Sequence, residues 1–166
     1  MRLGEKKLGR GQPCFITFEA GATHDGLKSA LQLVAHAAAA GADAVKFQIF
    51  DPDRLVQDKQ QMFSYDILLD KKTGETKTVT EPLYDILKRR YLTPEEWKMV
   101  KKMSDSKGLG FFATVGFEED IELLVSLGCD SIKIASADVD HWPLIRLAAR
   151  TGMFIQLDTG SAALGE

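Results

Sequence analysis

The stretch at residues 44–48 reads AVKFQ, a short apolar run with a lysine and an amide inside it. An unpaired ammonium in an apolar core is costly, so Lys46 either reaches solvent or faces an anion. The same pattern returns at residues 131–136, where SIKIAS places Lys133 among apolar residues. Two predicted strands that each carry a lysine in a core position indicate two walls of one anion-binding site.

Strands and helices are predicted to alternate along the chain on both sides of this stretch. β-Prone runs predict strands at residues 14–18, 44–50, 110–114, 131–135 and 153–157. Apolar residues at helical spacing predict helices at residues 27–40, 93–107, 117–127 and 142–150. The second helix begins with a capping box of Thr93 and Glu96, with Pro94 at its first position. This alternation implies a parallel sheet with helices outside it.

Polar side chains lie at the carboxyl end of every predicted strand. In chain order they are Glu19, Lys46 and Gln48, Thr114, Lys133 and Ser136, then Asp158 and Thr159. A (β/α)8 barrel places its chemistry at this edge, whereas a doubly wound sheet concentrates it near one switch point. No Gly-x-Gly-x-x-Gly follows the first strand, which disfavours a dinucleotide-binding sheet. The sequence therefore predicts an α/β fold of the (β/α)8 TIM-barrel type.

The barrel prediction accounts for about the first five of eight strands. A complete barrel typically has about 250 residues, and the chain has 166. We expect residues 1–13 to form an N-terminal arm and residues 14–166 the N-terminal part of a TIM-barrel synthase domain. Either the chain is a fragment, or another copy or chain completes it. The long polar connection at residues 51–90 has a KKTGETK centre, which predicts a hairpin tip or a mobile loop.

Composition excludes several classes of protein. The formal net charge of -3 gives no global basic field for nucleic acid, and the 45% apolar content is ample for a core. No apolar run approaches the roughly 18 residues of a membrane span, and the first residues lack a signal-peptide pattern. Cys14 and Cys129 are too few for a zinc motif and are expected to be free thiols. We expect a cytoplasmic protein without a nucleic-acid or membrane partner.

The two lysines define the candidate chemistry. Lys46 and Lys133 can flank a phosphate or carboxylate, and Thr114, Ser136 and Thr159 add hydroxyl donors. The alternative is that each lysine sits at a strand end and reaches solvent. Thr159-Gly160-Ser161 lacks the Gly-x-Ser-x-Gly frame of a nucleophile elbow and is better suited to binding an anion.

Other polar residues at this edge can hold a second, neutral ligand. Glu19 and Gln48 offer a carboxylate and an amide to the hydroxyls or amide of a sugar, although Glu19 can also pair with Lys46. Asp138 follows the fourth strand, where it either positions water or a ligand or is simply solvated. His24 lies in the first strand–helix loop, where it either faces the site or, as is commoner for a lone loop histidine, is solvated. The histidines have no metal-ligand spacing. We therefore assign no metal ligand.

At these residues the chain resembles the sialic acid synthase (N-acetylneuraminate synthase) family, which includes the legionaminic acid, pseudaminic acid and spore-coat polysaccharide synthases. EAGATHDG at residues 19–26 is similar to the family's Glu-Ile-Gly-x-Asn-His-x-Gly, and GADAVKFQ at residues 41–48 is a near match. LTPEEW, FAT, IKIAS and LDTG, at residues 92–97, 112–114, 132–136 and 157–160, match in order.

The resemblance implies a transferase that condenses phosphoenolpyruvate with an N-acyl aminosugar to give a nonulosonic acid and phosphate. By position, Lys46, Thr114, Lys133 and Ser136 would hold phosphoenolpyruvate, while Glu19 and Gln48 would face the aminosugar. Glu19 and Lys46 are the expected catalytic residues. The family uses Mn²⁺ or Mg²⁺ as a Lewis acid, with ligands expected beyond Glu166. The resemblance also implies a homo-oligomer, and we expect the isolated chain to release little phosphate.

Two residues depart from the family pattern. The family asparagine before the histidine is Thr23, and the family serine before Thr-Gly is Asp158. A carboxylate at position 158 would repel a phosphate unless a lysine or a metal compensates. Two alternatives remain: a phosphoenolpyruvate-condensing barrel of the Kdo 8-phosphate or DAHP synthase type, and a non-catalytic half-barrel that pairs through its exposed strand edges.

Overall fold

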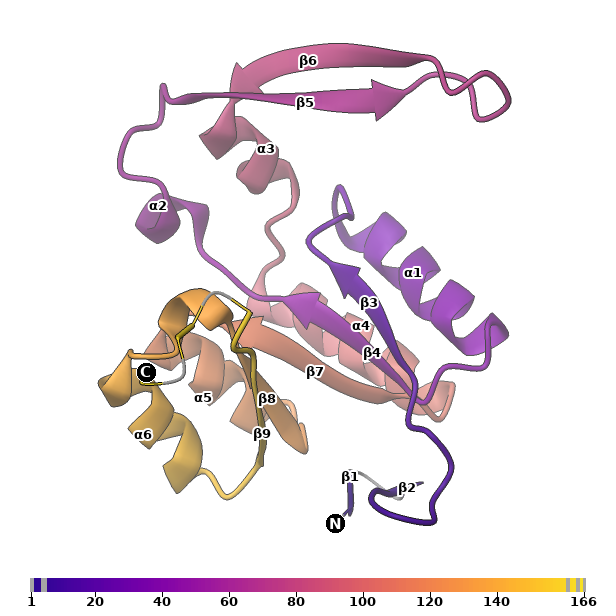
Figure 1. Ribbon diagram of the computed structural model, residues 1–166, viewed down its shortest axis with the longest axis vertical. Coiled ribbons are helices and arrows are strands. Elements are labelled where there is room, and N and C mark those ends of the chain that lie inside the picture. The colour runs from indigo at the N-terminus through magenta and orange to yellow at the C-terminus, as the bar shows by residue number, and fades with distance from the viewer. Residues whose placement is uncertain (1, 4–5, 161, 164, 166) are drawn as a thin grey trace. The chain divides into compact units, whose positions relative to one another are not determined.

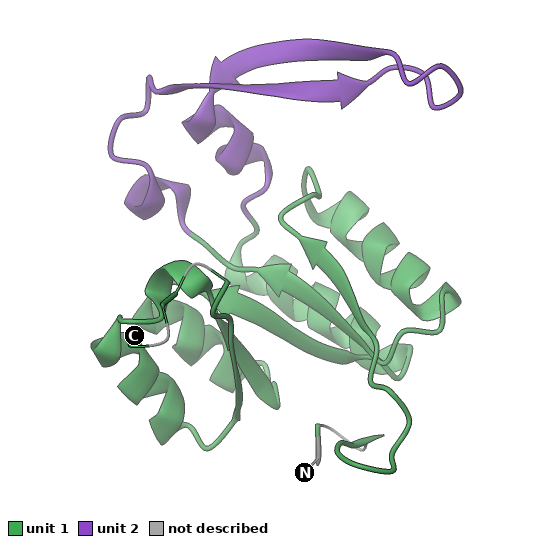
Figure 2. Ribbon diagram, viewed as in Figure 1, with its two compact units in different colours: residues 1–50, 92–166 green, residues 51–91 purple. Residues whose placement is uncertain are grey.

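The computed structural model describes residues 2–3, 6–160, 162–163 and 165. The chain divides into two compact units, one formed by residues 1–50 and 92–166 and the other by residues 51–91 (Figure 2). The connection between the second and third predicted strands is therefore a folded unit of its own. In the described part of the chain, no helix is both long and apolar enough to span a bilayer.

The first unit is built on a five-stranded parallel sheet (Figure 1). Its strands are β3 (Thr17–Gly21), β4 (Ala44–Gln48), β7 (Gly110–Val115), β8 (Ser131–Ile134) and β9 (Phe154–Leu157), and they pair in that order. Helices α1 (Leu27–Ala39), α4 (Pro94–Ser106), α5 (Glu118–Ser126) and α6 (Trp142–Arg150) connect them. Sequential strands are thus neighbours throughout, as the alternation predicted.

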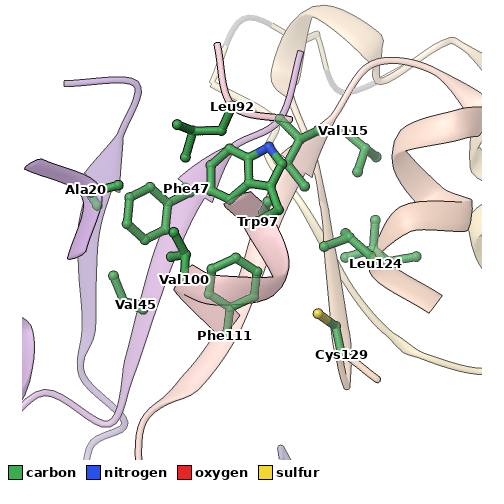
Figure 3. Close-up of a cluster of buried hydrophobic side chains, with 14 of the residues drawn as sticks. Ala20, Val45, Phe47, Leu92, Trp97, Val100, Phe111, Val115, Leu124 and Cys129 are labelled. Carbon is green, nitrogen blue, oxygen red and sulfur yellow. The ribbon is translucent and has the colours of Figure 1, made fainter. Parts of the chain in front are cut away.

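All four helices pack against the same face of the sheet. Alternate strand residues such as Val45, Phe47 and Ile132 enter one core cluster together with Val34, Val100, Leu124 and Ala148 of the four helices. Figure 3 shows part of this cluster, in which the Phe47 and Trp97 ring centroids are 5.5 Å apart. A doubly wound sheet carries helices on both faces. Helices on one face only are the arrangement of a barrel wall.

The start of α4 is as its sequence predicts. The Thr93 hydroxyl accepts a hydrogen bond from the Glu96 backbone N–H at 3.3 Å, and the Glu96 carboxylate accepts one from the Thr93 N–H at 2.8 Å. This reciprocal pair satisfies two backbone donors that a helix N-terminus otherwise leaves without partners. At the start of α5, Asp120 accepts from the N–H groups of Gly116 and Phe117, both at 3.0 Å.

The first strand of the sheet differs from its predicted bounds. It was expected at residues 14–18 with Glu19 after it, but β3 runs from Thr17 to Gly21 and includes Glu19. A register irregularity between Glu19 and Gly21, with Gly21 at a φ of 55°, extends the strand beyond the polar residue. Within the expected N-terminal arm, β1 (Arg2–Leu3) and β2 (Lys6–Lys7) form a short antiparallel ladder.

The second unit is an antiparallel hairpin with two short helices. Strands β5 (Met62–Leu68) and β6 (Thr76–Pro82) pair along their full length, and α2 (Pro52–Leu55) and α3 (Leu83–Arg89) flank them. The KKTGETK stretch forms the tip, where Gly74 has a φ of 74°. The sequence prediction of a hairpin tip is therefore confirmed.

One network holds this hairpin to its helix. Glu81 of β6 accepts two hydrogen bonds from the Arg89 guanidinium, at 2.7 and 2.8 Å, and a third from the Tyr65 hydroxyl at 2.7 Å. These hydrogen bonds, with that of Arg89 the strongest influence, lower the pKa of Glu81 to about 2. These hydrogen bonds link β5, β6 and α3 within the second unit.

Candidate functional site

The candidate residues share the sheet face that the helices do not cover. Side chains alternate between faces along a strand, and the core cluster takes one set. Glu19, Lys46, Gln48, Thr114 and Lys133 belong to the other set. The register places Glu19 beside Lys46, and it aligns Gln48, Thr114 and Lys133 in one row across three adjacent strands. Residues up to 114 positions apart in sequence therefore meet on one surface.

Lys46 is buried and paired. Its ammonium forms an ion pair with the carboxylate of its register partner Glu19, and the Lys46 side chain is only 11% exposed while that of Glu19 is 56% exposed. The hypothesis that Lys46 reaches solvent is therefore wrong. The hypothesis of a Glu19–Lys46 ion pair is confirmed, and the Glu19 carboxylate is the accessible end of that pair.

Lys133 repeats this arrangement on the other side of β7. Its ammonium lies 2.5 Å from the Asp158 carboxylate, with the side chains 9% and 55% exposed respectively. Asp158 directly follows β9, and its backbone N–H donates to the Ile134 carbonyl at 3.1 Å. The sheet ladder therefore continues to Asp158 and holds its backbone in place. The lysine compensates the carboxylate that the sequence placed here.

β7, the strand between those that carry the two lysines, bears a polar atom without a partner, the Thr114 hydroxyl oxygen. Thr114 is 8% exposed, and its Oγ1 is buried with no hydrogen-bond partner. Leaving a buried hydroxyl without a partner costs about 1–3 kcal/mol. Because the row of register partners places Thr114 directly between Gln48 and Lys133, this hydroxyl is available to a ligand held by the lysines.

The remaining predicted residues lie at the carboxyl edge with looser placement. Ser136 and Asp138 form the 3-10 turn η1 (Ser136–Asp138) after β8 and are half-buried. Gln48 and Thr159 are exposed. Ser161, which the sequence grouped with Thr159, lies outside the described residues. The structure thus places Glu19, Lys46, Gln48, Thr114 and Lys133 on one sheet face and pairs Lys133 with Asp158, while Ser136, Asp138 and Thr159 follow the strand ends.

His24 behaves differently from the sequence expectation. It is 1% exposed rather than solvated, and its ring packs edge-on against Phe47 and Trp97 with centroid distances of 5.8 and 5.9 Å. The aromatic cluster of the core thereby anchors the loop that follows Glu19. A polar residue in a Gly-rich loop gives no local signal of such burial, so only the packing reveals it.

The described residues do not fit a metal site. In that part of the chain, no group of three or more His, Cys, Asp or Glu side chains is arranged to hold an ion. Both cysteines are free, and burial raises the pKa of the Cys129 thiol to about 12, which makes it unreactive. The described residues at the carboxyl edge offer lysine, carboxylate and hydroxyl groups.

A hollow of about 410 Å³ lies at the opposite edge of the sheet. Its lining comes from the residues that precede β4, β7 and β8, including Asp43, Gly108 and Asp130. Both lysines in its wall are already paired, Lys6 with Asp43 at 2.6 Å and Lys101 with Asp105 at 2.7 Å. In barrels the amino-terminal edge serves stability rather than chemistry, so we place the functional site at the carboxyl edge.

Five parallel strands, helices on one face and buried lysines at the carboxyl edge define a wall of a (β/α)8-barrel of the kind that carries enzyme sites. A family model described as the NeuB family matches residues 33–166, and the chain belongs to this family.

Relatives of known name agree with this assignment. The N,N'-diacetyllegionaminic acid synthase of Legionella pneumophila is 34% identical over 98% of this chain and 44% of its own length. The spore coat polysaccharide biosynthesis protein SpsE of Bacillus subtilis is 33% identical over 99% of this chain and 42% of its own length. The chain thus spans less than half the length of these relatives.

A solved structure shows the same fold. The N-acetylneuraminic acid (sialic acid) synthetase of Leptospira borgpetersenii, determined in complex with citrate, superposes with a TM-score of 0.79 at 29% identity. The match covers 99% of this chain and 51% of that one. This chain therefore supplies five consecutive strands of such a barrel.

Proposed function

We propose that this chain carries the phosphoenolpyruvate-binding part of a synthase that makes a nonulosonic acid. The observation that carries the proposal is the uncovered sheet face, where the partnerless Thr114 hydroxyl lies on β7 between Gln48 and the buried Lys133, and the buried Lys46 lies on the same face of β4. The names of the relatives supply the class of product, because they include acid synthases for legionaminic and sialic acids.

The two ends of the ligand fit the charges of the site. Phosphoenolpyruvate carries a carboxylate and a phosphate, and the two ammonium groups can each meet one anionic group. Thr114 would donate its buried hydroxyl hydrogen to an anionic oxygen between them, and Ser136 would add a second hydroxyl at the strand end. Burial strengthens such charge-assisted contacts because the local dielectric is lower than that of water.

The exposed side of the site suits the second substrate. Glu19 and Gln48 lie at the carboxyl edge with accessible polar groups, and they would receive the hydroxyls and amide of an N-acyl aminosugar. In the proposed reaction the methylene carbon of phosphoenolpyruvate bonds to the sugar aldehyde carbon. Water adds to the former enol carbon, and phosphate departs with cleavage of its C–O bond. This chain's residues hold and orient the reactants, with Lys46 and Lys133 offsetting the charges of the carboxylate and the phosphate.

A binding experiment tests the proposal. Phosphoenolpyruvate is titrated into the 166-residue chain and into a Thr114→Val variant, and ³¹P NMR line widths and calorimetry report the dissociation constants. We expect saturable binding that weakens several-fold in the variant. Binding that is absent, or that is indifferent to Thr114, Lys46 and Lys133, would contradict the proposal. A preference for phosphorylated sugars over N-acyl aminosugars as the second ligand would favour the Kdo 8-phosphate or DAHP synthase type.

A further inference from the structure

Asp158 is the unusual member of the site, because a carboxylate stands where an anion is proposed to bind. Its oxygen lies 2.5 Å from the Lys133 ammonium, so the charge that would attract the ligand is already matched inside the protein. An anion that approaches Lys133 meets the carboxylate at the same time. It must either displace Asp158 from the ammonium or accept like-charge repulsion from it.

The sheet keeps Asp158 in this position. The hydrogen bond from its N–H to the Ile134 carbonyl extends the β8–β9 ladder by one residue. Gln156, two residues earlier on the same face, is the register partner of Lys133. The Asp158 side chain therefore projects from the same face as Lys133, one pleat nearer the carboxyl edge. Its proximity to the ammonium is a consequence of strand register rather than of a free loop.

The repulsion depends on the charge of the approaching group. A phosphate ester carries a charge between about −1.5 and −2 at neutral pH, whereas a carboxylate carries one negative charge. We propose that Asp158 is a specificity-determining residue, which occupies Lys133 and disfavours a phosphate group there relative to a carboxylate. The inference rests on the proposed function, because it concerns the same anion site.

The exposure of the pair makes the effect measurable without unfolding the protein. The Asp158 side chain is 55% exposed, so its replacement leaves no cavity, although the buried Lys133 ammonium loses its carboxylate partner. Solvent screening limits the repulsion to a fraction of its value in a dry interior. We therefore expect a moderate effect on affinity and a small loss of thermal stability, comparable with that expected for Glu19→Gln.

The test compares two ligands that share a carboxylate, of which only one also carries a phosphate. Phosphoenolpyruvate and pyruvate are titrated into the wild-type chain, Asp158→Asn and Asp158→Glu, with dissociation constants from NMR or calorimetry. We expect Asp158→Asn to bind phosphoenolpyruvate about tenfold more tightly, equivalent to about 1.4 kcal/mol, with a much smaller change for pyruvate. Asp158→Glu retains the charge and should keep the wild-type preference.

Two further variants separate this effect from general changes. Asp105→Asn alters the net charge equally, but Asp105 pairs with Lys101 within α4, so phosphoenolpyruvate affinity should not change. In a Lys133→Met background, Asp158→Asn should lose most of its effect on the ratio of the two affinities. If phosphoenolpyruvate binds in a Lys46-dependent way but Asp158→Asn leaves the ratio unchanged or lowers it, the inference is wrong. If no variant binds phosphoenolpyruvate, the proposed function itself fails.

Discussion

Thr114 and Lys133 are register partners on the adjacent strands β7 and β8, and they are 8% and 7% exposed. Lys133 brings a buried charge, and Thr114 brings a buried hydroxyl oxygen without a partner. Lys133 is already paired with Asp158, so the Thr114 hydroxyl is the group that lacks a partner, and a bound anion would satisfy it.

Thr114→Val should separate stability from function. The variant keeps the branched shape and removes the partnerless hydroxyl, so the free energy of unfolding should stay the same or rise by up to about 1 kcal/mol. Phosphoenolpyruvate binding should weaken several-fold. Chemical denaturation and calorimetry measure the two quantities, and Thr114→Ser, which retains the hydroxyl, should keep the affinity. A large loss of stability in Thr114→Val would show that the hydroxyl has a structural role.

The Glu19–Lys46 pair should respond asymmetrically to mutation. Glu19→Gln leaves the buried ammonium of Lys46 without its carboxylate, whereas Lys46→Met leaves only the exposed carboxylate of Glu19. Removing one partner of a buried charge is costly chiefly through the charge left behind. We expect Glu19→Gln to cost about 1–2 kcal/mol and Lys46→Met less than about 0.5 kcal/mol. Urea denaturation of both variants checks the order, and equal costs would indicate that Lys46 relaxes to solvent.

The capping box of α4 should contribute measurably to stability. Thr93→Ala removes the hydroxyl that accepts from the Glu96 N–H and should lower the free energy of unfolding by about 1 kcal/mol. Thr93→Ser retains the acceptor and should recover most of that loss. Thermal denaturation followed by circular dichroism compares the three proteins. An unchanged melting temperature in Thr93→Ala would mean that α4 is held by packing alone.

Acid should weaken the second unit through Glu81. Its pKa lies at about 2 in the folded protein, below the ordinary value of 4.5, because Arg89 and Tyr65 donate hydrogen bonds to the carboxylate. A depressed pKa stabilises the folded form above pH 4.5, and this contribution is lost as pH falls from 4.5 toward 2. Amide hydrogen exchange in β5 and β6 should therefore accelerate over that interval. Glu81→Gln should remove most of the dependence, and an unaltered profile in that variant would assign it to other carboxylates.

Sequence patterns were sufficient for most of the fold. The alternation of apolar runs located the five strands of the sheet, and the Thr93–Glu96 spacing located the start of α4. These signals are local, because capping and side-chain periodicity depend on residues within a few positions of each other. The first strand was displaced toward Gly21, where its pairing with β4 passes through a register irregularity that no local propensity indicates.

The sequence by itself determined that Lys46, Thr114 and Lys133 stand at the carboxyl ends of strands, which was enough to predict an anion site. Only the tertiary structure decided how these groups are balanced. It paired Lys46 with Glu19 and Lys133 with Asp158, left the Thr114 oxygen without a partner, and buried His24 in the aromatic core. These contacts join residues that are distant in the chain, and the register of parallel strands sets them, which no local pattern encodes.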